Sequence, residues 1–289
     1  MPGSPSTYQD LIRAGTTRLN DAGIETARLD TEVLLREVAG LDRAGLFLRL
    51  PERAPDGLEE RFAALLDQRV AGAPVAYITG RREFMGLAFR VGPPVLISRP
   101  ETELLVEWAL EVIAGRPGVT VADVGTGSGP IAIAVAALAD PGVRIIATDL
   151  SPAALAIAGE NAAALLDGGQ RARIEFRAGS LLEPVAGSVD LVLANLPYLT
   201  PGQVDGNPDL AAEPRLALDG GADGLDLVRA LVDDLPRVLA PGGAVGLELD
   251  PSQTATVEGL LREWFPGRTV RTIHDLAGLG RHVVMEAAG

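Results

Sequence analysis

The spacing of apolar positions divides the chain into three stretches. From Ser6 to about Ala71, apolar residues lie three and four positions apart, as in Leu58–Val70, which is typical of amphipathic helices. Ser6 and Asp56 precede such runs and are expected to be helix N-caps. No polar cluster suited to catalysis occurs there. Residues 1–75 are therefore predicted to form a small helical domain for recognition or support.

The second stretch, residues 76–98, is rich in β-branched and aromatic side chains. Met85 and Gly86 separate Arg82–Phe84 from Leu87–Val91, a pattern that predicts a β-hairpin. We expect this hairpin to link the helical domain to the rest of the chain.

Residues 99–289 alternate between strand-length apolar runs and helix-like stretches. This alternation predicts an α/β, Rossmann-like domain, in which helices cover both faces of a parallel sheet. The last two strands are joined by a short glycine-rich link, which predicts an antiparallel edge pair in a seven-stranded sheet. The expected strands are Val119–Val124, Arg144–Thr148, Ile174–Arg177, Asp190–Ala194, Gly243–Leu249, Thr269–Ile273 and His282–Glu286.

Composition narrows the possible functions. The chain has 289 residues, 47% of them hydrophobic, which is enough for sizeable cores. The absence of Cys excludes disulfides, zinc–thiolate sites and thiol nucleophiles. We see no signal-peptide pattern and no uninterrupted apolar run near the about 18 residues that a membrane span needs. A cytoplasmic protein that does not enter a membrane is the expectation.

The net charge argues against nucleic acid as a direct partner. It is −14, and every basic residue is Arg. An acidic surface repels phosphate backbones, whose binding depends largely on Lys and Arg. Arg81, Arg82, Arg90 and Arg99 could form a local basic patch, but scattered solvated arginines are the simpler interpretation.

Candidate chemistry begins at a glycine-rich turn after the first expected strand of the sheet. Gly125, Gly127 and Gly129 allow a tight turn and a close approach of the backbone to a ligand, and Pro130 then begins a helix. Asp149 ends the next strand, where an acid can bind both hydroxyls of an adenosine ribose. The turn and Asp149 together predict a site for an adenosine-containing cofactor.

Both a nicotinamide cofactor and S-adenosylmethionine suit such a turn. The Gly-x-Gly-x-Gly spacing, the acid Asp123 just before it and the antiparallel edge pair favour S-adenosylmethionine. Asp123 could bind the cationic methionyl end, directly or through water, or it could instead cap amides of the loop.

The segment Asn195-Leu196-Pro197-Tyr198, which we call the clamp, indicates the reaction. It follows a strand, so it should lie at the same sheet edge as the glycine turn. A carboxamide nitrogen is a poor nucleophile because its lone pair is delocalised. The Asn195 side-chain oxygen and the Leu196 carbonyl could accept both amide protons and direct the lone pair at a methyl group. Pro197 would fix the loop and Tyr198 would form a ring wall, although a simple strand-ending turn is the alternative.

These motifs are part of a wider similarity. The chain resembles the release factor glutamine N5-methyltransferases, the PrmC/HemK family, over nearly its whole length. The segments that carry the resemblance are Pro74–Gly80, Glu83-Phe84, Leu96–Glu103, the glycine turn, Glu213–Arg215, Ala217-Leu218, Gly220-Gly221, Asp223–Asp226 and His274–Gly278 with Arg281. The resemblance implies a class I S-adenosylmethionine-dependent methyltransferase domain over residues 99–289. The implied reaction methylates the Gln of the Gly-Gly-Gln motif in peptide-chain release factors.

The resemblance also implies a set of site residues. The helical domain would help to hold the release factor, and we expect the enzyme to act as a monomer without a metal ion. The catalytic residues implied are Asn195, Leu196, Pro197 and Tyr198. The cofactor-binding residues implied are Asp123, Gly125, Thr126, Gly127, Ser128, Gly129, Asp149, Leu150, Ser180, Leu181 and Asn195.

Three positions depart from the family pattern. Leu196 replaces the first Pro of Asn-Pro-Pro-Tyr, Ser180 stands where an acid is usual, and Ser98 where Pro is common. The carbonyl at 196 survives, whereas Ser180 offers only a neutral hydrogen bond. Methylation of another glutamine, as in ribosomal protein uL3, or of a small amide therefore stays open.

Two further hypotheses compete with this one. The clamp also resembles that of ribosomal RNA adenine N6-dimethyltransferases, which explains Leu196 but neither the acidic charge nor the segment Arg99–Glu103. The other hypothesis is a protein that binds the cofactor and regulates translation without catalysing a reaction. The intact Asn195 and Tyr198 argue against it.

Several other residues are expected to have structural roles. His274 and His282 have no nearby carboxylate pattern that would make a metal site. Gly168-Gly169-Gln170 copies the substrate tripeptide but lies between a helix and a strand, which favours a chance turn. Glu101 and Glu103 suit helix capping and a role at the site equally well.

Overall fold

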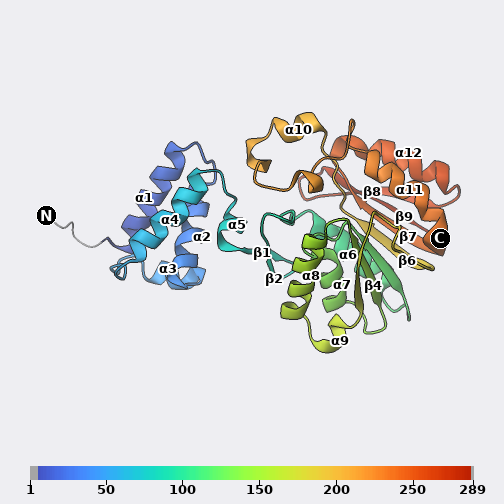
Figure 1. Cartoon of the computed structure of the whole chain (residues 1–289), viewed down its shortest axis with the longest axis horizontal. Helices are drawn as coiled ribbons and strands as arrows, with labels where there is room; N and C mark the ends of the chain where they lie inside the picture. The colour runs from blue at the N-terminus through green and yellow to red at the C-terminus, as the bar shows by residue number, and fades with distance from the viewer. Residues whose placement is uncertain (1–5, 288–289) are drawn as a thin grey trace. The chain divides into compact units, whose positions relative to one another are not determined.

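The computed structural model describes residues 6–287, which form two compact units, residues 6–80 and 81–287 (Figure 1). The first five residues of the expected N-terminal domain lie outside the described part of the chain. Each unit has its own hydrophobic core.

The smaller unit is helical, as predicted. Fully buried leucines and Phe62 form its core, and Arg69 pairs with the buried Asp30 at 2.8 Å. Its helices are α1 Tyr8–Asp21, α2 Ala27–Ala39, α3 Arg43–Leu48, α4 Leu58–Val70 and α5 Val75–Thr79.

Both predicted N-caps of this unit are wrong by one residue. The hydroxyl of Thr7, not Ser6, accepts the Asp10 amide proton at 3.1 Å and forms a capping box. Gly57, not Asp56, precedes α4 and has a left-handed conformation. Ser, Thr, Asp and Gly all occur at helix N-caps, so two such neighbours cannot be separated by pattern alone, because the backbone geometry at the helix start selects between them.

The strand-like texture after residue 76 begins with a short helix. Val75 and Ile78 of α5 pack against the core of the smaller unit. The predicted hairpin follows as β1 (Arg81–Phe84) and β2 (Leu87–Arg90), paired antiparallel. Its turn has positive φ at Met85 (50°) and Gly86 (73°), which matches the right-handed twist of the strands.

The hairpin packs within the larger unit. Phe84 and Phe89 are buried and contact edge to face, with ring centroids 6.1 Å apart. The Asn161 side chain of α8 (Pro152–Leu165) accepts from the Arg90 amide at 2.8 Å and donates to the Arg90 carbonyl at 3.0 Å. A separate linker over residues 76–98 stays a prediction.

The predicted sheet is confirmed. Its order is β5-β4-β3-β6-β7-β9-β8, parallel from β5 to β7, whereas β9 runs antiparallel to both β7 and β8. Only β8 of the antiparallel pair forms the edge. The strands are β3 Thr120–Val124, β4 Arg144–Asp149, β5 Ile174–Ala178, β6 Val189–Ala194, β7 Leu239–Glu248, β8 Thr269–His274 and β9 Gly280–Glu286.

Helices cover both faces of this sheet (Figure 1). Val245 and Leu247 of β7 share a core cluster with α11 and α12, whereas a Cβ on Gly246 between them would meet Trp108 and Leu105 of α6. The α-helices are α6 Thr102–Ile113, α7 Pro130–Leu138, α8 Pro152–Leu165, α9 Gly168–Arg171, α10 Pro201–Asp205, α11 Asp226–Val238 and α12 Thr254–Trp264; 3₁₀ turns are η1 Pro208–Leu210, η2 Arg215–Ala217 and η3 Pro251–Gln253. In residues 6–287 no helix is long and apolar enough to cross a membrane.

Candidate active site

The glycine turn lies between β3 and α7, with two of its amides held by the neighbouring strand. The amides of Gly125 and Thr126 both donate to the Thr148 carbonyl at 2.9 Å. A Cβ on Gly125 would lie 3.1 Å from Leu196 Cδ2, so the turn and the clamp are in direct contact. At Gly129 a Cβ would lie 2.8 Å from Ile133, in a backbone conformation that favours glycine (φ 88°).

Asp123 supports this turn from behind. Its Oδ2 accepts from the Thr126 hydroxyl at 2.6 Å and from the Ala132 amide of α7 at 3.1 Å. Oδ1 is buried and has no hydrogen-bond partner among the described residues. Burial raises the pKa of this carboxyl to about 7, an effect that the bond from Thr126 opposes. The carboxylate therefore braces the turn and the start of α7, and it is not part of the lining of the first cavity.

Asp149, at the end of β4, faces a cavity of about 330 Å³. Its Oδ2 accepts from the Gly127 amide and its Oδ1 from the Ser151 amide, both at 2.8 Å. Each oxygen retains a lone pair for a further donor. This carboxylate is therefore held rigidly at the cavity wall.

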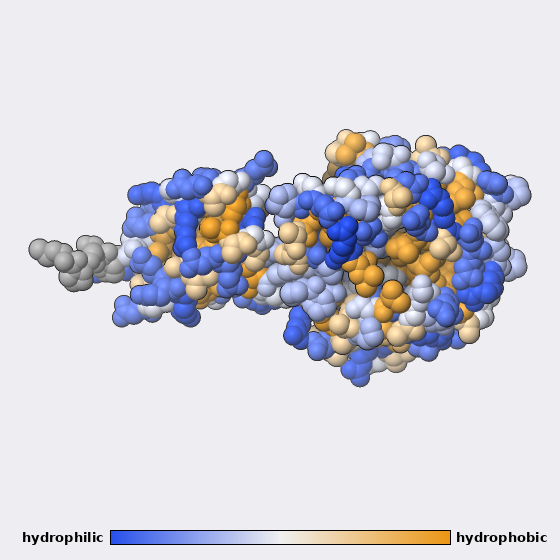
Figure 2. Space-filling model, turned by 45° about the horizontal axis from the view of Figure 1, so that its top comes forward, coloured by the Kyte–Doolittle hydropathy of each residue, from blue (hydrophilic) through white to orange (hydrophobic). Residues whose placement is uncertain are grey.

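Apolar side chains form much of the same cavity. Leu150 projects with 59% of its surface exposed, and Leu181 has a positive φ of 48°. The buried Thr148 hydroxyl donates to the Leu181 carbonyl at 2.8 Å and holds that unusual conformation. Non-glycine residues with positive φ often occur at binding sites. Figure 2 shows hydrophobic surface gathered in a hollow of the larger unit.

The clamp separates this cavity from a second one. Asn195, Leu196 and Pro197 line both, whereas Tyr198 lines only the second, of about 210 Å³. Asn195 Nδ2 donates to the hydroxyl of Thr102 at 3.0 Å. Thr102 is 2% exposed and begins α6. With its amino group bound there, the carboxamide has its oxygen available as an acceptor.

Tyr198 presents a neutral ring. Burial, followed by the Glu248 carboxylate, raises the pKa of its hydroxyl to about 12. A phenol with this pKa stays protonated near neutral pH, so Tyr198 does not serve as a general base.

A buried carboxylate joins two segments beside the clamp. Glu213 Oε1 accepts from Arg99 at 2.5 Å, and its Oε2 accepts from the Ile97 amide at 3.0 Å. Leu96 and Ala217, which flank this link along the chain, line both cavities. The link therefore fixes two walls of the site.

The predicted site residues fall into two groups. The predicted cofactor-binding residues that line the first cavity are Gly125, Gly127, Asp149, Leu150, Ser180, Leu181 and Asn195. Those placed elsewhere are Asp123, Thr126, Ser128 and Gly129, all of which are buried. The sequence alone assigned no role to Thr102, Glu213 or Ala217. The one feature that could have pointed to them is their position in segments shared with the PrmC/HemK family.

His282 has one carboxylate neighbour that the local sequence pattern does not show. His282 Nε2 lies 3.5 Å from Glu248 Oε2, and both side chains are buried between β9 and β7. Sequence spacing could not show this pair, because antiparallel pairing brings the two together. The described residues hold no group of three or more His, Cys, Asp or Glu arranged as metal ligands.

Glu103, Arg90 and Arg99 form polar contacts, whereas Glu101 forms no capping bond. Glu103 accepts the Met85 amide proton at 2.7 Å and ties the hairpin turn to α6. Glu101 precedes α6 without a side-chain capping bond. Arg90 pairs with Glu160, and Arg99 with Glu213, which counters a free basic patch.

Family models match both parts of the chain. The model described as PrmC N-terminal domain matches residues 10–80, and that of ribosomal protein L11 methyltransferase (PrmA) matches residues 86–197.

Solved structures show the same fold as the larger unit. The catalytic domain of hMettl16 in complex with the MAT2A 3′UTR hairpin 6 matches with a TM-score of 0.57 and 15% identity, over 77% of this chain and 81% of that one. The 16S rRNA N2 G1207 methyltransferase RsmC of T. thermophilus, in complex with AdoMet and guanosine, matches with a TM-score of 0.52 and 19% identity, over 72% and 49%. At these identities the match concerns the class I methyltransferase fold alone.

Whole-length relatives carry one name, release factor glutamine methyltransferase. The protein of Moorella thermoacetica is 42% identical over 95% of this chain and 96% of its own. That of Cereibacter sphaeroides is 43% identical over 95% and 96%, and that of Deinococcus radiodurans 38% over 97% and 99%. Because the similarity spans both units at this identity, the chain belongs to the release factor glutamine methyltransferase family.

Proposed function

We propose that this enzyme transfers a methyl group from S-adenosylmethionine to the side-chain nitrogen of the Gln in the Gly-Gly-Gln motif of peptide-chain release factors. The observation that carries the proposal is the position of Asn195, Leu196 and Pro197 between two cavities. A methyl donor on one side and an amide on the other would meet at these residues.

The first cavity fits S-adenosylmethionine. The Asp149 carboxylate, with lone pairs left on both oxygens, suits the two ribose hydroxyls. Leu150 and Leu181 offer apolar surface to an adenine ring, whereas Asp123 lies behind the glycine turn and supports it instead of lining the cavity. Ser180, also on the wall, offers a neutral acceptor in place of the family's acid.

The clamp residues orient the substrate amide. When bound, S-adenosylmethionine supplies an electrophilic methyl group. Asn195 Oδ1 and the Leu196 carbonyl accept the two amide protons, which directs the nitrogen lone pair toward the first cavity. Because the reactants are already oriented when bound, much of the entropic cost of bringing them together is met before the chemical step. The neutral Tyr198 ring bounds the amide, and the proton leaves after transfer, when the methylated amide is acidic.

Other substrates are less well supported. A uL3 glutamine or a small amide would suit the same clamp, but whole-length relatives are named for release factors. A ribosomal RNA adenine is supported by fold similarity alone. Because release factors act in translation, the proposal places the enzyme in the cytoplasm. Action as a monomer remains a prediction.

The test is methyl incorporation from radiolabelled S-adenosylmethionine into a bacterial release factor. We expect label in the wild-type factor and none in its Gln→Ala variant at the Gly-Gly-Gln motif. Asn195→Ala should nearly abolish transfer while S-adenosylmethionine affinity stays within about fivefold, because one clamp acceptor is lost and Asp149 is untouched. Label in both factors, or undiminished transfer by Asn195→Ala, would refute the assignment.

A further inference from the structure

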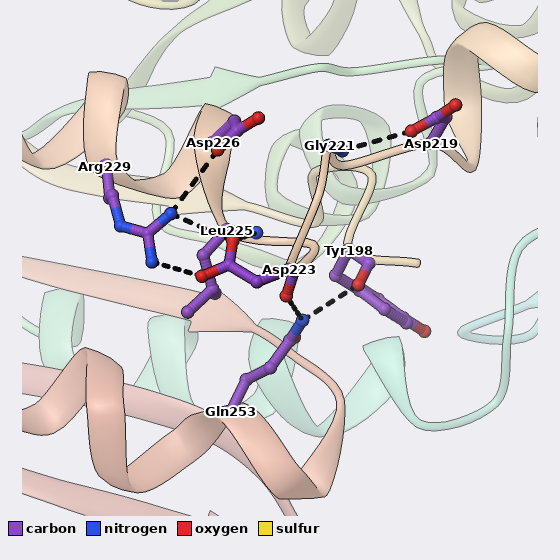
Figure 3. Close-up of polar contacts among 8 residues, drawn as sticks. All are labelled: Tyr198, Asp219, Gly221, Asp223, Leu225, Asp226, Arg229 and Gln253. Carbon is purple, nitrogen blue, oxygen red and sulfur yellow. Dashed lines mark hydrogen bonds and ion pairs between the residues drawn. The ribbon is translucent and has the colours of Figure 1, made fainter. Parts of the chain in front are cut away.

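Gln253 has every polar atom of its side chain in use. It ends η3, just after β7, and is only 8% exposed. Its Nε2 donates to the Tyr198 carbonyl at 2.9 Å and to the Asp223 carbonyl at 3.1 Å (Figure 3), whereas Oε1 accepts from the Asp250 amide at 3.2 Å. A flipped amide would direct its oxygen at two carbonyl oxygens. The side chain is therefore fixed in one orientation and connects three segments of the chain.

The loop of residues 218–226 packs directly against the clamp backbone. The Leu199 amide donates to Leu218 at 3.0 Å, and the Gly220 amide donates to Leu199 at 2.8 Å. A Cβ on Gly220 would meet the Pro197 carbonyl, and one on Gly224 would meet the Tyr198 carbonyl and Gln253 Nε2. These glycines let the loop approach the clamp carbonyls more closely than any side chain would permit.

The outer side of the loop is anchored to α11. Asp223 forms an ion pair with Arg229 at 2.5 Å, as drawn in Figure 3. Hydrogen bonds from this guanidinium lower the pKa of Asp223 to about 2, so the pair stays charged. The loop is therefore held from both sides, by Arg229 and by Gln253.

We propose that Gln253 is a positioning residue of the clamp, acting through the Tyr198 carbonyl and the loop 218–226. The inference rests on the proposed function, because it concerns the orientation of the bound amide. Leu196 lacks the ring that would fix its φ, so this clamp depends more on restraint from outside. Without the Gln253 hydrogen bonds, the peptide planes from residue 196 to 198 can rotate more freely, and the Leu196 carbonyl is no longer held pointing at the substrate amide.

The first test is Gln253→Glu, with Gln253→Met as its uncharged counterpart. Glu keeps the size and the acceptor for the Asp250 amide, but an ionised carboxylate donates no hydrogen bond. In both variants we expect kcat on the release factor to fall at least about tenfold, because a small displacement of the reacting atoms can cost about that much or more in rate. The affinity for S-adenosylmethionine should stay within about twofold, since Gln253 does not line the first cavity.

A pair of glycine variants tests the same contact from the other side. Gly224→Ala places a methyl against the Tyr198 carbonyl, at φ 75°. Gly242→Ala is the control, because it introduces the same kind of backbone strain at φ 79° but its Cβ has no atom within 4 Å. Gly242 lies toward the start of β7, whereas Gln253 follows the end of that strand. Gly224→Ala should lower kcat as Gln253→Glu does, whereas Gly242→Ala should leave it unchanged.

Amide hydrogen exchange supplies a readout that needs no substrate. Peptides over residues 195–200 and 218–226 should exchange faster in Gln253→Glu and Gly224→Ala than in the wild type and Gly242→Ala. The inference would be overturned if Gln253→Glu and Gly224→Ala both kept the wild-type kcat. It would also be overturned if their loss of kcat merely followed the unfolded fraction measured by thermal melting. If the wild type labels no release factor, the proposed function fails, whereas unchanged exchange in Gln253→Glu would refute the positioning role alone.

Discussion

At the scale of single residues, Thr102 determines which edge of the Asn195 carboxamide faces the substrate. Its hydroxyl accepts the Nδ2 proton at 3.0 Å in a buried position. Thr102→Val keeps the shape but leaves that amino group without a partner, at a cost of about 1–3 kcal/mol, so the carboxamide is no longer held with its oxygen toward the substrate. We expect the single-turnover methyl-transfer rate to fall about tenfold or more, since the clamp then presents a donor in place of an acceptor.

Thr102→Ser is the matched control for this prediction. It retains the hydroxyl, so its transfer rate should stay near that of the wild type, and its melting temperature should be compared with that of Thr102→Val. Equal rates for the two variants would show that the hydroxyl has no part in orienting Asn195.

Asp123 predicts a pH dependence of stability. Burial raises its pKa in the folded chain to about 7, above the ordinary value of 3.8 for an Asp side chain, so the folded chain binds the extra proton between these pH values. The stability that this group contributes is therefore present at low pH and is lost as pH rises from about 4 to about 7. In denaturant unfolding, wild type should lose stability relative to Asp123→Asn over this window, by up to about 1.4 kcal/mol per pH unit. The curves should run parallel above about pH 8; parallel curves throughout would contradict the assignment.

At the scale of elements, the strands were predictable and the polar network around the clamp was not. Apolar runs mark the inner strands such as β6 and β7, because a strand buried on both faces needs continuous apolar residues. The edge strands β5 and β8 mix apolar and polar residues and are only partly buried. The clamp and Asp149 followed from their places at strand ends.

The supports of the clamp depend on long-range contacts. The partner of Asn195 is 93 positions away in Thr102, and that of Tyr198 is 55 positions away in Gln253. Glu213 reaches Ile97 across 116 positions. No local pattern encodes such pairs, because the fold alone brings the segments together. The one-residue errors at Ser6 and Asp56 are different, since there two adjacent residues compete for one cap.

The short helix α9 predicts that the enzyme does not label itself. Its Gly168-Gly169-Gln170 sequence copies the substrate motif, yet the Gln170 carboxamide accepts from the Asp167 amide at 3.1 Å and donates to the Ala137 carbonyl at 3.3 Å. Helical geometry and these bonds withhold Gln170 from the clamp of another copy. Incubation with labelled S-adenosylmethionine alone should leave the enzyme unlabelled, and a methylated Gln170 peptide in mass spectrometry would refute this.

At the scale of the whole molecule, the two units divide the proposed work. All residues that line the two cavities belong to the larger unit, from Pro94 to Leu227. The core of the smaller unit ends with Val75 and Ile78, so a cut after Gly80 divides neither core. The smaller unit matches the PrmC N-terminal domain, and its proposed role is to hold the release factor.

This division predicts distinct losses in a fragment of residues 81–289. The fragment should bind S-adenosylmethionine within about threefold of the full chain, because every cavity residue is retained. Its KM for the release factor should rise at least about tenfold, while kcat changes little, since removing a docking surface weakens substrate and transition state alike. Calorimetry and steady-state methyl transfer measure the two effects separately. A fragment with full affinity for the release factor would assign the smaller unit to support alone, and one that folds without binding the cofactor would show that the first cavity depends on it.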